Sequence, residues 1–571
     1  MTTRIERRKQ WKIADVDRSK VNAIVEAHEV PRIVAHCMCA RGITTVEAAQ
    51  RYLNPTLSNI CDPFEMSGMR EAVDRIERAR DQDERVVVFG DYDVDGIAGT
   101  ALLVRALRYY GIEKLDFGLP NRQQEGYGLS PDRVDWAVSL GASLIITVDN
   151  GIAAVDAANH ARSKEIDLIV TDHHLPGEEL PLAVAVVNPK LEADDFSGCD
   201  LCGAALAFQL GRALTGKAGG LDLAAMGTIA DVVPLTGDNR DLAAAGLAHI
   251  RMKPRAGIAA LNRVSKLNAA ELRAESIAYQ IAPRINAGGR MGDGTAGLDL
   301  LLSDDFDETD RLATDLDEVN EDRREVERAV QNEVLQELER SFVPDQRSIV
   351  LARRNWHAGV IGIVASRIQD QYYRPVILIA LDENGKGRGS GRSIEGFDLA
   401  GAIASCGHLL EKHGGHTAAA GLTIEAKNVA AFREAFEQVA HDGLPKGELL
   451  KPLRIDAQVA LSSIDPQLIH ALDRLQPCGH HNASPVFATF GAEIVPGSCR
   501  ELRGGHLKMM VRDDNATLHA IGFGMADRLN AIGSADAVDI AFAPQFNTWR
   551  GETSIQLLLK DICPAGDQDV G

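Results

Sequence analysis

The chain has 571 residues, of which 45% are hydrophobic and 25% are charged. This composition excludes a largely disordered protein, and the length favours three or more domains. The formal charge of −21 argues against a general polyanion-binding surface. Locally the balance reverses, because eight Lys and Arg stand against three Asp and Glu between Arg347 and Arg392. A basic lining of this kind can still steer a phosphate chain.

The sequence shows no membrane or export signal. No apolar run approaches the roughly 18 residues that span a bilayer, and Met1–Lys12 has no apolar segment of the secretory type. We therefore expect a cytoplasmic protein without a membrane partner. The nine cysteines form an odd set that fits free thiols. Cys199-x-x-Cys202 lacks the further ligands that a zinc site needs.

The residue pattern divides the chain into five parts. We expect a helical lead-in over 1–80, an α/β domain over 81–300, a densely charged connecting helix over 301–345, a second α/β domain over 346–445 and a β-rich region over 446–571. In the first α/β domain, short apolar runs alternate with helical segments, which is typical of a doubly wound parallel sheet. The runs are 86–89, 115–118, 144–148, 168–170 and 184–187.

Three acids follow the first of these apolar runs. Asp91, Asp93 and Asp95 come directly after it, and Gly96 then begins a helical segment. If the chain stays extended past the run, alternation places the three carboxylates on one side. Such like charges repel one another, and a divalent cation such as Mg²⁺ or Mn²⁺ relieves the repulsion. The alternative is an acidic turn that only caps the helix.

Later runs end in further acids and imidazoles, namely Asp149, Asp172, His173 and His174. Another acid, Asp231, lies in an apolar stretch, where burial of an unpaired carboxylate is unfavourable. We expect all these residues at equivalent strand ends, because those ends meet at one edge of a doubly wound sheet. The sequence therefore predicts a metal site at that edge.

These segments resemble the successive motifs of the DHH phosphoesterase superfamily. The resemblance rests on Asp-Tyr-Asp-Val-Asp-Gly at 91–96, Asp-Asn-Gly at 149–151, Asp-His-His at 172–174 and Gly-Thr-Ile-Ala-Asp at 227–231. It implies two divalent ions, Mn²⁺ or Mg²⁺, with Asp149 as the bridge, and it places His174 opposite the scissile phosphate. The implied ligands are Asp91, Asp93, Asp95, Asp149, His173 and Asp231. In much of the superfamily a His stands at the position of Asp91.

Two such ions activate a water molecule and stabilise both the attacking and the leaving oxygen. The sequence has no G-x-S-x-G nucleophile elbow. We therefore expect direct hydrolysis, without a covalent intermediate, by a catalytic set that consists of Asp93, Asp95, Asp149, His173, His174 and Asp231.

Glycine pairs, arginines and an imidazole recur in 282–290, 389–393 and 414–421. Solvated arginines and ordinary turns are the alternative explanation of each segment. Together with 356–367 they resemble the DHHA1 domain of RecJ-like enzymes, whose hallmark is Gly-Gly-His-x-x-Ala-Ala-Gly. The resemblance implies that Arg290, Ser390 and Arg392 hold a 5′-terminal phosphate. The further implied substrate contacts are Arg284, Asn286, Gly415 and His416.

The β-rich region resembles the OB-fold region of RecJ-like enzymes over 476–487 and 547–551. An OB groove with aromatic and basic residues suits single strands. Cys478, His481 and Ala483 depart from the usual Pro-Phe-Gly-x-Gly-Asn-Pro pattern. The His481 change matters if this turn needs a positive φ, where Gly is preferred.

The resemblance implies a single-stranded-DNA-specific 5′→3′ exonuclease that releases nucleoside 5′-monophosphates in recombination and repair. Its implied partners are a single strand with a 5′ end, single-strand-binding protein and a helicase. One alternative is a DHH phosphodiesterase for short oligonucleotides or cyclic dinucleotides, which the C-terminal region disfavours. Another is a non-catalytic single-strand-binding replication scaffold, which the full set of acids disfavours.

Overall fold

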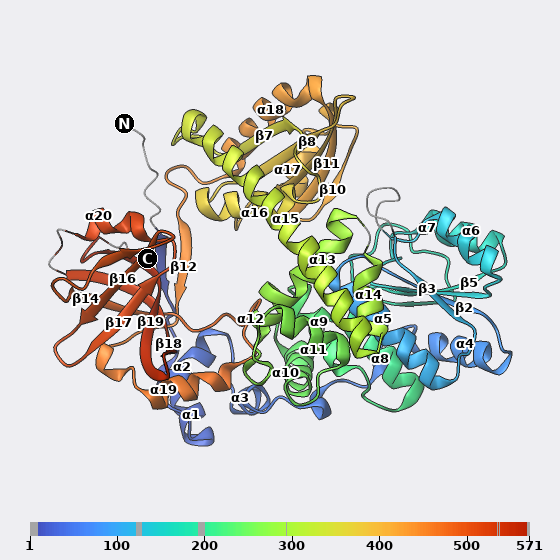
Figure 1. Ribbon diagram of the computed structural model, residues 1–571, viewed down its shortest axis with the longest axis horizontal. Helices are drawn as coiled ribbons and strands as arrows, with labels where there is room; N and C mark the ends of the chain where they lie inside the picture. The colour runs from blue at the N-terminus through green and yellow to red at the C-terminus, as the bar shows by residue number, and fades with distance from the viewer. Residues whose placement is uncertain are drawn as a thin grey trace. The chain divides into compact units, whose positions relative to one another are not determined.

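The chain forms two compact units (Figure 1). One unit comprises Ile13–Val319 with Arg454–Gln568, and the other is built on Asn320–Leu453. The computed structural model describes residues 9–120, 128–191, 200–292, 294–533, 535 and 537–567. No helix in these ranges combines the length and the apolar composition needed to cross a membrane.

The first α/β domain is built on a five-stranded sheet in the order β3-β2-β4-β5-β6. All neighbouring strands are parallel, which confirms the predicted doubly wound sheet. The order reverses between β2 and β4, and ligands of such sheets bind at that switch point. The strands are β2 (Val86–Gly90), β3 (Leu115–Gly118), β4 (Leu144–Val148), β5 (Asp167–Thr171) and β6 (Ala185–Val187).

Helices cover both faces of this sheet (Figure 1). Alternate residues of β2 enter different cores: Val86 and Val88 pack with α4, α5 and α8, whereas Val87 and Phe89 pack with α6 and α7. Helix α4 therefore belongs to the core of this domain, and the expected boundary at residue 80 falls near its end. The helices are α4 (Met69–Asp81), α5 (Val94–Tyr110), α6 (Pro131–Leu140), α7 (Val155–Ser163) and α8 (Gly203–Thr215).

A further group of helices extends the core that contains α5 and α8. A π-helical turn, Ile277–Ile281, leads directly into α13. The long charged helix that we expected is α15 (Phe306–Ser341), with 36 residues. The other helices of this group are α9 (Leu221–Ala230), α10 (Gly237–Met252), α11 (Ala256–Val264), α12 (Ala274–Ser276), α13 (Ala282–Met291) and α14 (Thr295–Leu302).

The C-terminal region is a β-barrel, as the OB resemblance predicted. Its seven strands run in the order β13-β14-β18-β19-β17-β16-β15, and an additional β14–β16 pairing closes the sheet. The helices α1 (Arg18–His28), α2 (Arg32–Ala40) and α3 (Val46–Leu53) share its core. The strands are β13 (Ala457–Gln458), β14 (Phe487–Ile494), β15 (Arg500–Leu502), β16 (His506–Arg512), β17 (Thr517–Gly522), β18 (Ala537–Trp549) and β19 (Glu552–Pro564).

The unit built on Asn320–Leu453 contains a mixed sheet in the order β10-β11-β9-β8-β7. Only β7 and β8 among its strands are parallel. The elements are β7 (Ile349–Arg354), α16 (Ile361–Tyr372), β8 (Val376–Leu381), β9 (Lys386–Arg392), α17 (Leu399–Ser405), β10 (Lys412–Gly415), β11 (Ala419–Glu425) and α18 (Val429–Gly443). Strands β1 (Lys9–Ile13) and β12 (Lys451–Ile455) form a separate two-stranded sheet.

The turn at 479–482, between strands β13 and β14 of the barrel, has a positive φ, which is the condition that the sequence raised. His481 has a φ of 56°, so a residue with a side chain occupies the left-handed region that glycine favours. The turn is nonetheless well held, because Gly479 and Asn482 form a β-bridge. The neighbouring carbonyl of His480 accepts a hydrogen bond of 2.9 Å from Leu235 N, which ties this turn to the first α/β domain.

Candidate metal centre

The acidic loop after β2 turns into a helix sooner than the sequence suggested. Asp93 is extended, but α5 begins at Val94, so Asp95 already lies in the first helical turn. The Asp93 side chain caps this helix: its Oδ1 accepts hydrogen bonds from Asp95 N at 2.9 Å and Gly96 N at 3.1 Å. The expected alternation through Asp95 is therefore wrong, because the free N–H groups of the helix draw the Asp93 carboxylate to them.

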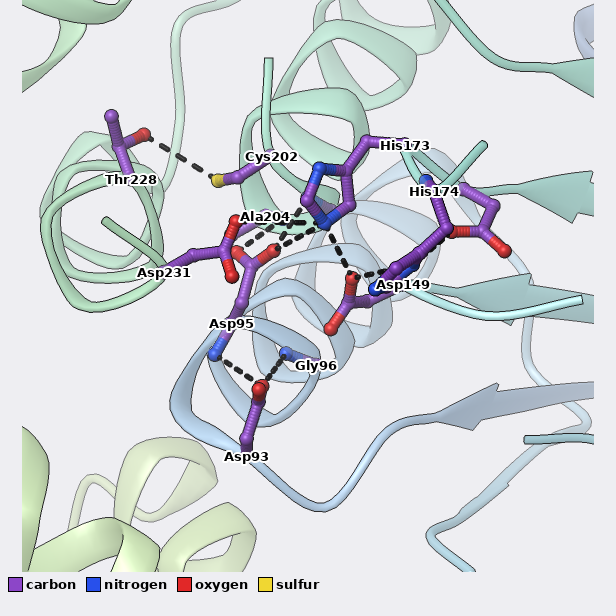
Figure 2. A network of polar contacts seen from close by, with 12 residues as sticks. Asp93, Asp95, Gly96, Asp149, His173, His174, Cys202, Ala204, Thr228 and Asp231 are labelled. Carbon is purple, nitrogen blue, oxygen red and sulfur yellow. Dashed lines mark hydrogen bonds and ion pairs between the residues drawn. The ribbon is translucent and has the colours of Figure 1, made fainter. Parts of the chain in front are cut away.

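The imidazole of His173 nevertheless joins carboxylates from three separate elements (Figure 2). Its Nε2 atom lies 3.1 Å from Asp149 Oδ1, 3.5 Å from Asp231 Oδ2 and 3.8 Å from Asp95 Oδ2. Asp149 follows β4 and His173 follows β5, as expected for strand ends at one sheet edge. The structure thus brings together four of the predicted residues at the switch point of the sheet.

Asp231 reaches the site from a different kind of element than we expected. It is the C-terminal cap of helix α9, so its placement at a strand end was wrong. The apolar stretch before it forms a buried helix, and a continuous apolar run of this length fits a buried helix as well as a strand.

Helix α8 holds the Asp95 carboxylate at its N-terminus. Gly203 N donates to Asp95 Oδ2 at 2.6 Å, and Ala204 N donates to Asp95 Oδ1 at 2.9 Å. The helix has no side-chain cap of its own, so the carboxylate satisfies N–H groups that would otherwise lack partners. The buried Cys202 immediately precedes this helix, whereas Cys199 lies outside the described residues.

Two glycines make the convergence sterically possible. A Cβ atom on Gly203 would overlap the Asp149 Cβ and would lie 2.9 Å from its Cα. A Cβ atom on Gly227 would overlap the Asp95 carboxylate. Neither position can carry a side chain without moving one of the clustered acids.

His174 is held by the first residue of the Asp-His-His motif. Asp172 Oδ1 lies 2.7 Å from His174 Nδ1 and also accepts from His174 N at 3.1 Å. Asp172 is buried, whereas the side chain of His174 is 37% exposed, so this imidazole reaches solvent where a substrate could meet it. Burial lowers the pKa of His174, but the contact with Asp172 outweighs this and raises it above the ordinary value.

The pKa values of Asp231, Asp149 and His173 reflect their burial and the nearby carboxylates. Burial, and then the charges of Asp95 and Asp93, raise the pKa of Asp231 to about 9. Burial and the neighbouring carboxylates raise the pKa of Asp149 well above its usual range. Burial lowers the pKa of His173 to about 4, so this imidazole is neutral at pH 7 and suited to bind a metal.

Three groups of side chains in the described part of the chain are close enough to hold an ion, with ligand atoms within 4.8 Å of one another. The groups are Asp91, Asp93 and Asp149; Asp95, His173 and Asp231; and Asp149, His173 and His174. Asp149 belongs to two of these groups. Carboxylate oxygens together with an imidazole suit Mn²⁺, whereas carboxylates alone suit Mg²⁺. The donor set therefore fits two divalent ions.

Three family models match successive parts of the chain. The DHH family N-terminal domain matches residues 85–230, the DHHA1 domain matches 345–442, and the RecJ OB domain matches 455–561. Together they follow the order in which the predicted domains occur.

Whole-length relatives give the same result. The single-stranded-DNA-specific exonuclease RecJ of Bacillus subtilis is 35% identical, with 97% of this chain and 70% of that protein covered. The RecJ of Escherichia coli is also 35% identical, with 94% and 96% covered. The chain belongs to the RecJ family. The RecJ crystal structure from Thermus thermophilus in complex with Mn²⁺ is 30% identical, has a TM-score of 0.86, and covers 99% of this chain and 81% of its own. A second structure of the Thermus protein contains Mg²⁺.

Two residues predicted to contact substrate in this RecJ-family chain have partners within the protein. Arg284 is buried, and its Nε donates to Asp317 Oδ1 at 2.8 Å. Asn286 Oδ1 accepts from Val94 N at 3.0 Å, so it braces the start of α5 beside the acidic loop. Arg290 lies further along the same helix, α13. Their contacts with substrate stay a prediction.

The remaining predicted contacts gather at one end of the second sheet. Arg392 donates through Nη1 to Ser390 Oγ at 3.2 Å, and Ala419 on β11 pairs with Arg392. Gly415 ends β10 in the left-handed region at φ 142°, and His416 N donates to Ala419 O at 2.8 Å. A Cβ atom on Gly362 would lie 2.9 Å from Ser390 Oγ, so the N-terminus of α16 packs against the same end.

Sequence reasoning missed the N-terminus of α8 as part of this centre. Its signal was weak, because Cys202-Gly203-Ala204 contains no typical capping residue. An apolar helix whose first residue is glycine and which lacks a cap nevertheless indicates N–H groups that need an anion from elsewhere.

We predict that Gly203→Ala weakens Mn²⁺ binding by about 10- to 100-fold, because the new methyl group displaces Asp149. Calorimetric titration with Mn²⁺ measures the loss. Gly219→Ala is the matched control, because a Cβ atom there meets nothing within 4 Å. Equal Mn²⁺ affinity in both variants would contradict the proposed steric overlap between a side chain at position 203 and Asp149.

We also predict that Mn²⁺ binding at pH 7 releases protons. Asp231, with its pKa of about 9, is protonated at pH 7 before the ion binds, so affinity should rise with pH up to about 9. Since this folded-state pKa exceeds the unfolded value, the metal-free protein should lose stability as pH rises from about 4 to 9. Calorimetry in buffers of different ionisation enthalpy counts the protons that Mn²⁺ binding releases. Mn²⁺ binding to the Asp231→Asn variant should release fewer protons. Proton-free binding in the parent chain would refute the linkage.

Proposed function

We propose that this chain is a single-stranded-DNA-specific exonuclease that works from the 5′ end and releases nucleoside 5′-monophosphates. Membership of the RecJ family supports the reaction and the substrate class. The observation that carries the proposal is the meeting of Asp95, Asp149 and Asp231 at the His173 imidazole. We further propose that it acts in the cytoplasm, in recombination and repair.

In this proposal, six side chains hold two divalent ions, with Asp149 shared between them. The ligands are Asp91, Asp93, Asp95, Asp149, His173 and Asp231. Bound ions would supply an activated water and neutralise charge on the phosphate. The protein supplies the geometry: α8 fixes Asp95, and Asp93 is fixed by the first turn of α5. Mn²⁺ and Mg²⁺ are the ions found in the Thermus relative.

His174 is the proposed contact to the scissile phosphate. The contact with Asp172 raises the pKa of His174, which favours the protonated imidazole. A protonated imidazole can donate a hydrogen bond to a phosphoryl oxygen and balance charge that develops there. Hydrolysis is direct, and trapping of a phosphoryl-enzyme would overturn that step.

Polarity would come from an anion site in the unit built on Asn320–Leu453. The Arg392 guanidinium, the Ser390 hydroxyl and the N-terminus of α16 lie together there. Arginine and a helix N-terminus both favour phosphate, so a 5′-terminal phosphate is the proposed ligand. Gly415 and His416 are further proposed contacts in this unit, Arg290 is a proposed substrate contact on α13, and single-strand binding is assigned to the barrel. Single-strand-binding protein and a helicase stay predicted partners.

The function is tested with four substrates: a 5′-labelled single strand, the matching duplex, a dinucleotide and a cyclic dinucleotide. We expect the single strand to be degraded to nucleoside 5′-monophosphates with Mn²⁺ or Mg²⁺, and chelator to abolish the reaction. Asp149→Asn should lower the rate by at least about 100-fold, because it removes charge from the shared ligand. Preference for either dinucleotide would favour the short-substrate alternative, and strand binding without hydrolysis would favour the scaffold.

The proposed clamp is tested by Arg392→Ala. We expect the preference for 5′-phosphorylated over 5′-hydroxyl ends to fall about tenfold or more, since a charged hydrogen-bond donor is lost. The measurement is kcat/KM on paired oligonucleotides that differ only in the end group. Arg388→Ala is the matched control, because this exposed arginine lies on the same strand, β9. An unchanged preference would remove Arg392 from the clamp.

A further inference from the structure

Val232, which directly follows Asp231, has an unusual backbone conformation. Its φ is 62°, and among the described residues it is the one β-branched residue with a positive φ. The two branches at Cβ crowd the backbone in this left-handed region, so β-branched residues rarely adopt it. Val232 thus stores conformational strain next to the proposed metal centre.

The turn itself does not require valine. Helices α5, α6 and α8 of the same domain also end in the left-handed region, and they do so with Gly111, Gly141 and Gly216. Glycine adopts this conformation without crowding. At the end of α9 the cap, Asp231, is right-handed, and the left-handed residue is the valine one position later.

The surrounding structure enforces the strain from both sides. Upstream, Asp231 N donates to Gly227 O at 2.9 Å and so remains part of the helix. Downstream, Leu235 is 2% exposed, and its N–H donates to the His480 carbonyl. Val232 has little freedom to rotate out of the left-handed region between these two fixed points.

Without a bound molecule, the Val232 side chain adds little to the stability of the fold. Val232 is 58% exposed, so most of its apolar surface is not used in the core. A side chain that strains the backbone and stays in solvent destabilises the fold relative to glycine. A molecule that binds beside Asp231 could supply the contact that offsets this cost.

We propose that Val232 packs against a base of the nucleotides that flank the scissile phosphate, and so contributes to substrate binding. This inference rests on the proposed nuclease function. The neighbouring Asp231 lies 3.5 Å from His173, so a phosphate bound at that cluster brings its nucleosides to the adjacent surface. An aliphatic side chain suits the flat apolar face of any base, so this contact would not depend on the sequence of the strand.

Two substitutions separate the side chain from the backbone. Val232→Gly relieves the strain, and Val232→Asn keeps a residue that tolerates the left-handed region but removes the apolar surface. Lys266→Gly is the control, because Lys266 is also exposed and left-handed, with φ 55°, and is not part of the proposed site. The substrates are a single strand and the same strand with its first two nucleotides abasic.

We expect Val232→Gly and Lys266→Gly both to raise the midpoint of thermal unfolding. Only the Val232 variants should lower kcat/KM on the normal strand, by about tenfold, the loss expected for one apolar contact. On the abasic strand they should match the parent chain within about twofold, since no base remains to be contacted. Mn²⁺ affinity should not change.

Three results would overturn the assignment. Equal losses on both strands would mean that Val232 acts through Asp231, and undiminished activity on the normal strand would mean that it contacts no base. A lower unfolding midpoint in Val232→Gly would show that the side chain stabilises the free chain instead. If the parent chain cuts neither strand, the nuclease function itself fails, and this inference fails with it.

Discussion

Repulsion among clustered carboxylates is the constraint on which the rest of the site depends. Asp91, Asp95 and Asp149 are each at most 3% exposed. Asp231 lies 3.5 Å from the His173 imidazole, which Asp95 and Asp149 also approach. Buried like charges are unfavourable unless counter-charges lie close by. The raised pKa values of Asp149 and Asp231 express this repulsion directly. Divalent cations are the counter-charges that would relieve this repulsion.

The fold relieves part of the repulsion with peptide dipoles. Helices α5 and α8 both begin at the cluster, and their first N–H groups hold Asp93 and Asp95 respectively. Each helix N-terminus carries a partial positive charge. Asp149 is positioned by its backbone, whose left-handed conformation, with φ 63°, turns it into the site after β4. This division fits the proposed roles: two acids are fixed in advance, and the shared ligand is a buried carboxyl whose pKa lies well above its usual range.

The sequence predicted the sheet and most of the site because both follow local patterns. Apolar runs fixed the strands, and the residues after them, Asp149 and His173, lie at the expected edge. The helix that carries Asp231 was not recognised, because a buried apolar run has the same composition in a helix and in a strand. The partners of Arg284 and Asn286 were also not predictable, since Asp317 and Val94 are brought to them only by tertiary packing.

The glycines at the site illustrate a second limit of sequence reasoning. Gly203 and Gly227 look like ordinary small residues in apolar helices. Their necessity is visible only once the neighbouring Asp149 and Asp95 are in place. Val232 is the opposite case, since nothing in a Val-Val-Pro segment indicates a positive φ. Such positions depend on a conformation that tertiary contacts impose.

The segment between β13 and β14 of the barrel extends these constraints beyond the first α/β domain. The Arg240 guanidinium lies 3.8 Å from the ring centre of Tyr52 and donates to the carbonyls of four successive residues, 474–477. A guanidinium that is only 2% exposed would be costly without these acceptors, so the segment is firmly anchored. The His480 carbonyl in turn fixes Leu235, four residues after Asp231. Because Asp231 and this segment of the barrel are tied to the same short loop, a shift of the segment would reach the metal centre through covalent bonds and hydrogen bonds rather than through solvent.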